Sequence, residues 1–339
     1  MPDRPAPTAP TAPVRWGVLG SSAYISGLLV PAVVASPTGR LTAVATRGDG
    51  EDPTTRLAVD AGARLLPDYA AVVEADDVDA VYVPLPNTLH VEWALRAIEA
   101  GKHVLVEKPL AMSEAEVREV QGAARARGVL VMEAFMYRFH PQHAHVRELV
   151  AQGRIGDVRA VRASFAFRID DPRNIRLHPE LGGGATFDVG CYATDVARWF
   201  LPGEPTRVQA TARRDAAGLD TTVAAVVDFP DDRVALLDYS IDFGQQAQYE
   251  VQGTHGSVRV DDAWAMAGDA ATVRVRDAAG RTVETVQVAG DHYRAEVEAF
   301  EAAVLAGAAD VPYAAEDSLG NARLLEAVLA AARHELVTL

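Results

Sequence analysis

Residues 14–25 read VRWGVLGSSAYI, a short apolar run followed by a glycine turn and the start of a helical pattern. An apolar run of this length, bounded by a turn signal, predicts a buried strand. A glycine turn between such a strand and a helix lets the backbone approach a pyrophosphate, which the helix N-terminus attracts. The stretch therefore predicts the first strand, turn and helix of a dinucleotide-binding sheet.

Short apolar runs and helical stretches continue to alternate downstream of this segment. Ser113 and Glu116 stand at the spacing of a capping box and predict the start of one helix. Strands that alternate with helices predict a parallel, doubly wound α/β sheet. The expected strands are 14–19, 41–46, 80–84, 103–106 and 129–132, and the expected helices are 24–35, 54–61, 91–100 and one that begins after residue 113.

The pattern changes in the second half of the chain. Residues 158–169 alternate between apolar and polar side chains, which predicts a strand with one buried face. Two further apolar runs flank the turn at 230–232 and predict an antiparallel hairpin. More strands are expected to about residue 288, and two helices, at 292–306 and 316–333, close the chain. This half therefore predicts an antiparallel sheet with helices on one face.

The chain has 339 residues, of which 49% are hydrophobic, so two domains can each bury a full core. We expect a disordered tail over residues 1–13, where proline, alanine and threonine dominate. Residues 14–149 are expected to form the Rossmann domain that binds the dinucleotide. Residues 150–339 are expected to form an α+β domain for substrate binding and oligomerisation. Its sheet is expected to be open and largely antiparallel, and its final helix can pack back on the first domain.

The composition excludes several classes of partner. The formal net charge of −15 repels the phosphates of nucleic acids and anionic lipids, so neither is an expected partner. The one cysteine, Cys191, cannot form an internal disulfide, and no metal site is expected. No run approaches the roughly 18 apolar residues of a membrane helix, and residues 1–13 lack the apolar core of a signal peptide. These features predict a cytoplasmic protein.

The turn after the first predicted strand matches the dinucleotide fingerprint only in part. Gly20 fits the glycine-rich pattern, whereas Ser22 and Ile25 stand where further glycines are common. An ordinary glycine turn between a strand and a helix is the alternative. The residues expected to hold the cofactor here are Gly20, Ser21, Ser22, Ala23, Tyr24 and Ile25.

The end of the second predicted strand bears on the choice of cofactor. An Asp or Glu at this point commonly bonds the ribose hydroxyls of NAD, but Thr46 and Arg47 stand there. Arg47 can stack on adenine and pair with a 2′-phosphate, which favours NADP(H) over NAD(H). Asp49 and Glu51 are close enough in sequence to keep NAD open, and a solvated Arg47 is the structural alternative.

Two segments contain the residues expected to take part in chemistry. They are PNTLH at 86–90 and GKHVLVEKP at 101–109. Lys108 stands at the carboxyl end of a parallel strand, where ligands of open α/β sheets bind. A partly desolvated lysine there can hydrogen-bond a reacting oxygen or relay a proton, although most lysines are simply solvated.

These segments resemble those of the glucose–fructose oxidoreductase/inositol dehydrogenase (Gfo/Idh/MocA) family, and the resemblance extends over nearly the whole chain from Val14. It implies a Rossmann domain followed by an antiparallel second domain, and a contact between Lys108 and the reacting carbonyl or hydroxyl. For His90, a histidine satisfied at its own helix start is the alternative role. The resemblance implies a place beside the nicotinamide and its ribose for Pro86, Asn87, His90, Glu107 and Lys108.

A further constellation reads GGGATFDVGCY at 182–192. Three glycines let a backbone pass close to a ligand, and Asp188 and Tyr192, four residues apart, share one helix face. The family resemblance implies an aspartate followed four residues later by His or Tyr, with Tyr typical of the sugar and keto-sugar reductase branch. Asp188 is expected to orient a substrate hydroxyl and Tyr192 to exchange the proton. A carboxylate favoured by the helix dipole and a packed aromatic ring are the alternatives.

Two more segments, 132–141 and 174–178, are expected to line the substrate pocket. The first resembles the family's segment after the fifth strand, and the second precedes the triple glycine. Loop and interdomain packing is the alternative role for both. Cys191 has no basic neighbour in the sequence to activate it, so we expect a buried, unreactive thiol. The expected substrate residues are Tyr137, Arg138, His140, Arg176 and His178.

The residues and the resemblance together predict an NADP(H)-dependent oxidoreductase. It is expected to transfer a hydride between the nicotinamide and a carbonyl or hydroxyl carbon of a sugar, a keto-sugar (free or nucleotide-linked) or a related diol. A non-catalytic NADP-binding regulatory protein is the rival prediction, and a tightly bound cofactor that cycles without release is a third. The second-domain strands need cover on both faces, which predicts a homodimer or homotetramer.

Overall fold

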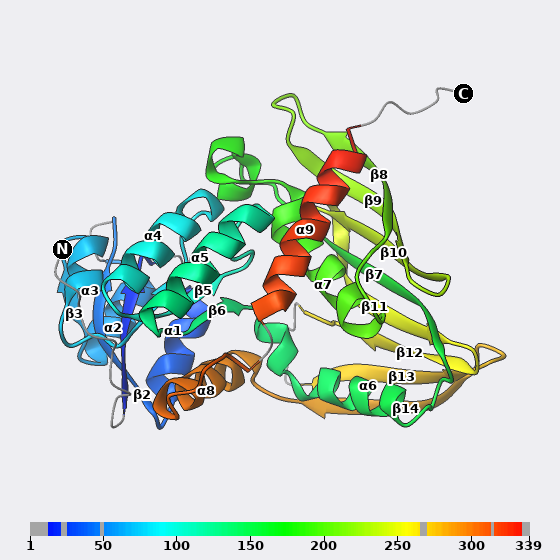
Figure 1. Cartoon of the computed structure of the whole chain (residues 1–339), viewed down its shortest axis with the longest axis horizontal. Helices are drawn as coiled ribbons and strands as arrows, with labels where there is room; N and C mark the ends of the chain where they lie inside the picture. The colour runs from blue at the N-terminus through cyan, green and yellow to red at the C-terminus, as the bar shows by residue number, and fades with distance from the viewer. Residues whose placement is uncertain (1–12, 22–25, 48–50, 265–269, 313–314, 334–339) are drawn as a thin grey trace. The chain divides into compact units, whose positions relative to one another are not determined.

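The structure is a computed structural model that describes residues 13–21, 26–47, 51–264, 270–312 and 315–333. The chain divides into two compact units (Figure 1). Unit 1 comprises Met1–Met136 and His292–Leu319, and unit 2 comprises Tyr137–Asp291 and Gly320–Leu339. The predicted domains, residues 14–149 for the dinucleotide and residues 150–339 for the substrate, stay a prediction.

Unit 1 contains a sheet of six parallel strands in the order β3-β2-β1-β4-β5-β6. The strand order reverses between β1 and β4, as it does in doubly wound sheets that bind dinucleotides. The fold predicted for this half of the chain is confirmed. The strands are β1 (Val14–Leu19), β2 (Gly39–Ala45), β3 (Arg64–Leu66), β4 (Ala80–Val83), β5 (His103–Glu107) and β6 (Val131–Ala134).

The inner strands β4 and β5 are buried at every residue, as expected for parallel strands covered on both faces. The predicted cap that begins α5 is present: the Ser113 hydroxyl accepts a hydrogen bond from the Glu116 N–H over 3.3 Å and donates one to Glu116 Oε2 over 3.0 Å. Gly128, in the left-handed conformation, ends the same helix. The helices of unit 1 are α1 (Ser26–Ala35), α2 (Pro53–Asp60), α3 (Tyr69–Glu74), α4 (Asn87–Glu99), α5 (Glu114–Arg127) and α8 (His292–Leu305).

Unit 2 contains a sheet of eight strands in the order β14-β13-β12-β11-β7-β10-β9-β8. All neighbouring pairs are antiparallel except β7 and β10, which run parallel. The predicted hairpin is the pair β9–β10, and its turn residues Asp231 and Asp232 have positive φ. The strands are β7 (Val158–Arg168), β8 (Arg207–Arg214), β9 (Asp220–Phe229), β10 (Arg233–Ser240), β11 (Asp242–Gly253), β12 (Gly256–Asp261), β13 (Ala270–Asp277) and β14 (Thr282–Ala289).

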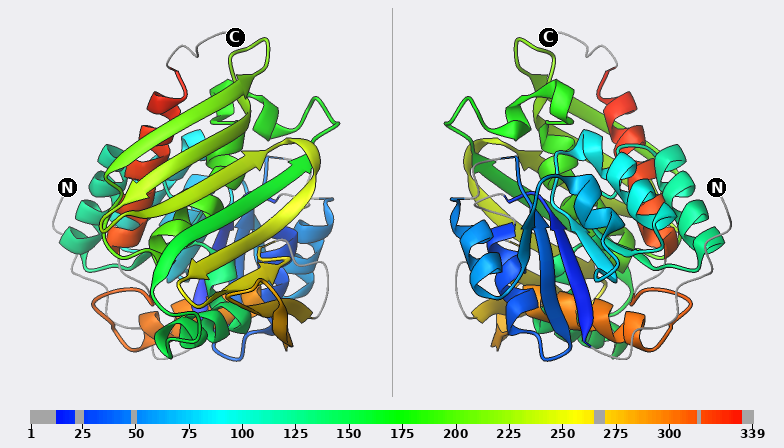
Figure 2. Two further views of the ribbon diagram at one scale, coloured as in Figure 1. Left: turned by 90° about the vertical axis from the view of Figure 1, so that its right-hand side faces the viewer. Right: turned by 90° about the vertical axis from the view of Figure 1, so that its left-hand side faces the viewer.

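The predicted alternation along β7 is present in its middle, where Val161, Ala163 and Phe165 are buried and Arg162 is exposed. Helix α7 packs on the buried face of β7, β10 and β11. The left view of Figure 2 looks onto the other face of these strands, in front of which no described helix of unit 2 lies. The sheet therefore has one covered and one open face.

The described helices of unit 2 lie before, between and after its strands in chain order. None of the helices in the described ranges is long and apolar enough to cross a membrane. The helical elements are α6 (Pro141–Ala151), α7 (Cys191–Phe200) and α9 (Ala315–Ala331), with the short turns η1 (Met136–Phe139), η2 (Ile175–Leu177), η3 (Pro179–Leu181) and η4 (Thr186–Gly190). The first residues of η1 and α9 belong to unit 1.

Candidate active site

The turn after β1 contains a residue that has to be glycine. Gly20 has a φ of +97°, and its N–H donates to the Ala45 carbonyl over 2.6 Å. A Cβ here would lie 3.2 Å from the Tyr69 hydroxyl and 3.3 Å from a methyl group of Leu85. The tight backbone turn that a pyrophosphate needs is thus present at the carboxyl end of β1. The predicted contacts at residues 22–25 (Ser22, Ala23, Tyr24 and Ile25) lie outside the described residues.

The segment after β2 brings Arg47 to the surface. Thr46 is half-buried, and its hydroxyl lies 2.9 Å from that of Ser21 in the first turn. Arg47 follows and is exposed. Its guanidinium therefore extends from the strand end at which NAD-binding sheets commonly carry a carboxylate.

The described carboxylates near this strand end have partners in unit 1. Asp52 caps α2, where it accepts hydrogen bonds from the backbone and hydroxyl of Thr55 and from the Ser21 hydroxyl. Burial raises the pKa of Asp52, but these hydrogen bonds outweigh burial and lower it overall. Glu51 pairs with Arg56 at 2.8 Å. Both groups are thus bonded within the protein, and Asp49 lies outside the described residues.

His90 is buried on α4, one turn after the predicted Asn87. Its Nδ1 lies 2.8 Å from the Pro109 carbonyl oxygen and its Nε2 lies 2.8 Å from the Leu85 carbonyl oxygen. Burial lowers the pKa of His90, whereas the two backbone bonds raise it. The ring joins the ends of β4 and β5. This arrangement matches the alternative of a satisfied histidine, and a contact with the cofactor stays a prediction.

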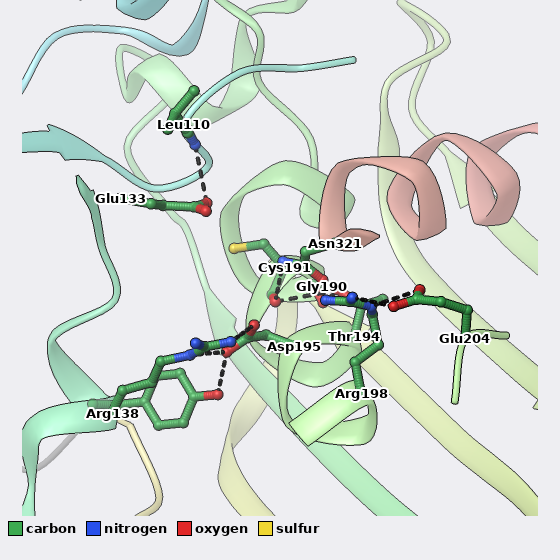
Figure 3. Close-up of polar contacts among 11 residues, drawn as sticks. Leu110, Glu133, Arg138, Gly190, Cys191, Thr194, Asp195, Arg198, Glu204 and Asn321 are labelled. Carbon is green, nitrogen blue, oxygen red and sulfur yellow. Dashed lines mark hydrogen bonds and ion pairs between the residues drawn. The ribbon is translucent and has the colours of Figure 1, made fainter. Parts of the chain in front are cut away.

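Two buried carboxylates hold the backbone around Lys108, which is half-buried and directly follows β5. Glu107 accepts hydrogen bonds from the Tyr82 hydroxyl, over 2.7 Å, and from the Lys108 N–H, over 3.2 Å. Glu133 on β6 accepts a hydrogen bond from the Leu110 N–H over 3.0 Å (Figure 3). A lysine that acts on a reacting oxygen needs this kind of rigid support.

The triple glycine of unit 2 packs against the chain itself. A Cβ on Gly183 would lie 2.4 Å from the Arg176 carbonyl oxygen, and one on Gly184 would lie 2.5 Å from a carboxylate oxygen of Asp220. Gly184 also has a φ of +111°, which side chains disfavour. Close contacts within unit 2 therefore explain these glycines without the ligand that the sequence suggested.

Asp188 lies in a π-helical turn, η4, which α7 continues. The sequence spacing predicted an α-helix throughout. Arg176 Nε lies 2.8 Å from Asp188 Oδ2, and both side chains are largely buried. Single π-turns within helices are frequent at functional sites. The structure thus brings together two of the predicted site residues, and the ion pair orients the Asp188 carboxylate.

Tyr192 lies in the first turn of α7 among other aromatic rings. It is 4% exposed. Phe165 meets its ring edge-on at a centroid distance of 5.3 Å, while Tyr137 and Trp264 lie 5.7 and 6.0 Å away. These neighbours restrict the ring, so the phenol hydroxyl has a defined direction.

Asp195 binds two of the predicted substrate residues. Arg138 Nε donates to Asp195 Oδ2 over 2.9 Å, its Nη2 donates to Oδ1, and the Tyr137 hydroxyl also donates to Oδ2 (Figure 3). The side chains of Arg138 and Asp195 are only 5% and 1% exposed. Burial raises the pKa of Tyr137, and the Asp195 charge adds to this effect. A buried, bidentate pair thus fixes both residues, and their contact with substrate stays a prediction.

The two predicted histidines of unit 2 have partners near them in sequence. His140 is buried and caps α6, where its Nδ1 accepts a hydrogen bond from the Gln142 N–H over 3.2 Å. Burial lowers the pKa of His140. His178 is half-exposed and lies 3.2 Å from both the Glu180 carboxylate and the Pro172 carbonyl. A substrate contact for either histidine stays a prediction.

Sequence reasoning missed Asp195, Asp220 and Trp264. Asp195 follows Tyr192 by one helical turn, so its spacing was a usable signal. Asp220 contacts Thr186 from 34 residues away, and no local pattern indicates such a pairing.

The order of the six parallel strands defines the class of Rossmann folds, which bind dinucleotides where the strand order reverses. Comparison with known proteins specifies the family. Residues 14–135 match the model of the oxidoreductase family with an NAD-binding Rossmann fold, and residues 143–259 match the GFO/IDH/MocA C-terminal domain. The chain belongs to this GFO/IDH/MocA oxidoreductase family, and the predicted resemblance is confirmed.

Similar proteins cover nearly the whole chain. D-xylose 1-dehydrogenase (NADP(+)) 2 of Haloferax volcanii is 38% identical over 93% of this chain and 96% of its own. The dTDP-3,4-didehydro-2,6-dideoxy-α-D-glucose 3-reductase of Actinomadura kijaniata is 34% identical over 95% of this chain and 96% of its own. The structure of KijD10, a 3-ketoreductase from Actinomadura kijaniata in complex with NADP and TDP-benzene, superposes with a TM-score of 0.88. It is 33% identical in sequence and covers 94% of this chain and 98% of its own.

Proposed function

We propose that this protein is an NADP(H)-dependent oxidoreductase that acts on a sugar, a keto-sugar (free or nucleotide-linked) or a related diol. One observation carries the proposal: full-length similarity to a D-xylose dehydrogenase named for NADP(+) and to a 3-ketoreductase whose structure contains NADP. The strand order of unit 1 and the support around Lys108 agree with it.

The residues present in unit 1 fit an NADP molecule. The positive φ of Gly20 forms a tight turn at the end of β1, and such a turn lets a phosphate approach the backbone. Ser21 and Thr46 line the same turn, and Arg47 would bind the 2′-phosphate. The bound cofactor would donate the hydride as NADPH or accept it as NADP+, so the protein has to bind and orient the substrate and exchange a proton with it. Pro86, Asn87, His90, Glu107 and Lys108 are proposed to line the nicotinamide end.

Three residues are proposed to act on the substrate. Lys108 would hydrogen-bond the reacting oxygen and hold a positive charge beside it. Tyr192 would exchange a proton with that oxygen, and Asp188, held by Arg176, would accept a hydrogen bond from a neighbouring hydroxyl. Tyr137, Arg138, His140, Arg176 and His178 remain proposed contacts of the rest of the substrate.

The test is cofactor titration followed by a substrate panel. The panel holds D-xylose and other aldoses, a nucleotide-linked keto-sugar and a trans-dihydrodiol, each followed at the nicotinamide absorbance band. We expect NADP(H) to bind and at least one member to be turned over. Binding without turnover of any member would reject the enzyme and favour the non-catalytic regulatory protein.

We further propose that the protein is cytoplasmic and forms a homodimer or homotetramer. The support for assembly is the open face of the eight-stranded sheet, because β9 carries the exposed side chains Ala224 and Val226 on that face. The sequence has one cysteine, Cys191, so no disulfide can form within the chain, which suits a reducing compartment.

A further inference from the structure

The helical segment that contains Asp188 and Tyr192 begins without a cap of its own. Ala185 precedes the π-turn and offers no side-chain hydrogen bond to the free N–H groups. These groups need acceptors when they are buried. The N–H and the hydroxyl of Thr186 both donate to Asp220 Oδ2, each over 2.7 Å. A carboxylate on the first residue of β9 therefore caps this segment from a distant part of the chain.

The surroundings of Asp220 bury its carboxylate and leave room for it beside the turn. The residue is 5% exposed. Gly184 gives its second carboxylate oxygen the space that it needs, because a Cβ on that glycine would lie 2.5 Å from Oδ1. Burial raises the pKa of Asp220, and the hydrogen bonds from Thr186 only partly offset this effect. A buried carboxylate is costly unless it is bonded, so the Thr186 contact and the fold of the turn depend on each other.

Further contacts hold the same turn. The Tyr239 hydroxyl lies 3.3 Å from the Thr186 hydroxyl, and a Cβ on Gly190 would lie 2.7 Å from the Tyr239 ring. Asn321 on α9 donates to the Cys191 carbonyl over 3.1 Å, where the π-turn meets α7 (Figure 3). The segment is therefore fixed at both ends, and the directions of Asp188 and Tyr192 follow from those attachments.

We propose that Asp220 is a positioning residue: through Thr186 it holds the π-turn so that Asp188 and Tyr192 reach the substrate together. This inference rests on the proposed function, because it assigns those two residues to the substrate. Asp220 itself is bonded to the turn and touches no reacting atom. Its loss should therefore reduce turnover while leaving unit 1 and its cofactor unchanged.

The experiment compares Asp220→Ala and Asp220→Asn with Val275→Ala. Val275 is buried on β13, near the opposite end of the sheet from β9, so its truncation weakens unit 2 away from the turn. For each protein we would measure amide hydrogen exchange over residues 184–192, the Kd of NADPH, and kcat and KM for a panel sugar that the wild type turns over.

Asp220→Ala should lower kcat by about 10²-fold, the loss that a displacement of about 1 Å causes. Exchange over 184–192 should become faster and the NADPH Kd should not change. Asp220→Asn keeps a carbonyl acceptor for Thr186 and should recover kcat to within about tenfold of the wild type. Val275→Ala should keep the wild-type kcat and the wild-type exchange over 184–192.

Three outcomes would overturn the inference in different ways. Wild-type kcat or unchanged local exchange in Asp220→Ala would reject the positioning role alone. Failure of Asp220→Asn to recover, with Val275→Ala equally impaired, would show a general loss of stability instead of positioning. A wild-type protein that turns over no panel member would reject the proposed function, and with it the role of Asp220 in turnover.

Discussion

Tyr192 contributes one hydroxyl to the proposed chemistry, while its ring contributes to packing. Tyr192→Phe keeps the ring contacts with Phe165 and Trp264, so the fold should survive. Loss of a general acid should lower kcat by roughly 10²–10⁴-fold with the Kd of NADPH unchanged. Single-turnover hydride transfer, followed at the nicotinamide absorbance, measures this. A rate within about threefold of the wild type would reject the proton-exchange role.

Single-turnover hydride transfer also tests the role of Lys108, with the variant Lys108→Ala. If Lys108 and Tyr192 act on one oxygen, Lys108→Ala should also lose most turnover and keep cofactor binding. The double variant should then be far less than additive, as groups that act as a unit are. Additive losses would place the two residues at different steps.

Arg47 should decide the preference between the two cofactors. Its guanidinium is exposed after β2, while Glu51 and Asp52 are bonded to other groups of the protein. Arg47→Ala should weaken NADP binding by about 1.5–3 kcal/mol and leave NAD binding nearly unchanged. Competitive titration of both cofactors against the wild type and the variant measures the difference. Equal affinities in the wild type would contradict the prediction.

His103 should make stability depend on pH. Its Nδ1 accepts a hydrogen bond from the Leu130 N–H, and burial lowers its pKa to about 4, with Asp79 raising it slightly. The folded protein thus binds fewer protons here than the unfolded chain, whose histidines titrate near 6.5. Neutral His103 therefore adds to the free energy of unfolding. This contribution has its full value of about 3 kcal/mol at most above pH 6.5, and it is lost as the pH falls towards 4.

The check on His103 is urea unfolding of the wild type and His103→Gln between pH 4 and pH 7. The difference in unfolding free energy between the two proteins should shrink steadily as the pH falls. A difference that stays constant across this range would mean that His103 does not change its charge there.

At the scale of elements, the buried carboxylate of Glu301 connects helix α8 to the parallel sheet through hydrogen bonds. Glu301 accepts hydrogen bonds from Trp16 Nε1, over 2.8 Å, and from the hydroxyls of Ser36 and Thr38, over 2.5 and 2.7 Å. Glu301→Ala would remove the acceptor of three donors, of which Trp16 and Ser36 are buried and Thr38 is half-buried, and should cost about 3–5 kcal/mol. Glu298→Ala is the control, because Glu298 makes a partly exposed pair on the same helix.

Urea unfolding measures both variants. Glu298→Ala should change the unfolding free energy by less than about 1 kcal/mol, as exposed pairs do. Equal losses in the two variants would mean that the Glu301 contacts do not hold α8 in place.

The sequence predicted those helices and strands whose type and ends depend on side chains within the element itself. β1, β4 and β5 are apolar runs buried on both faces, and α5 carries its own cap in Ser113. The sequence did not indicate β3, because it has three residues and none is buried. It also failed to indicate the π-turn at Asp188, whose shape depends on contacts with distant residues such as Asp220.

The residues of the candidate site also fall into two groups, those that local sequence places and those that tertiary packing places. The position of Lys108 follows from a strand and its end, which local sequence defines. The pairs Arg176–Asp188 and Arg138–Asp195 depend on how loops and helices of unit 2 pack, and a single sequence contains no record of that packing.

At the scale of the whole molecule, the open sheet of unit 2 should be the assembly surface. Ser164 donates to Asp238 over 2.6 Å on this face, and Arg162 is exposed beside them, so the surface is polar with an apolar patch at Val226. A second copy could cover such a face symmetrically. We therefore expect the purified protein to have a mass that is two or four times 36.1 kDa.

Light scattering with two matched variants tests this surface. Val226→Asp places a charge on the open face, and the charge would have to be buried if another copy covered it, so the mass should fall towards the monomer. Val59→Asp changes a similarly exposed valine on α2 of unit 1 and should leave the mass unchanged. A wild-type mass near 36.1 kDa at micromolar concentration would contradict assembly altogether. If the Val226→Asp protein still assembled, the interface would lie elsewhere. Burying an unpaired aspartate in the interface would cost a large part of the free energy of association.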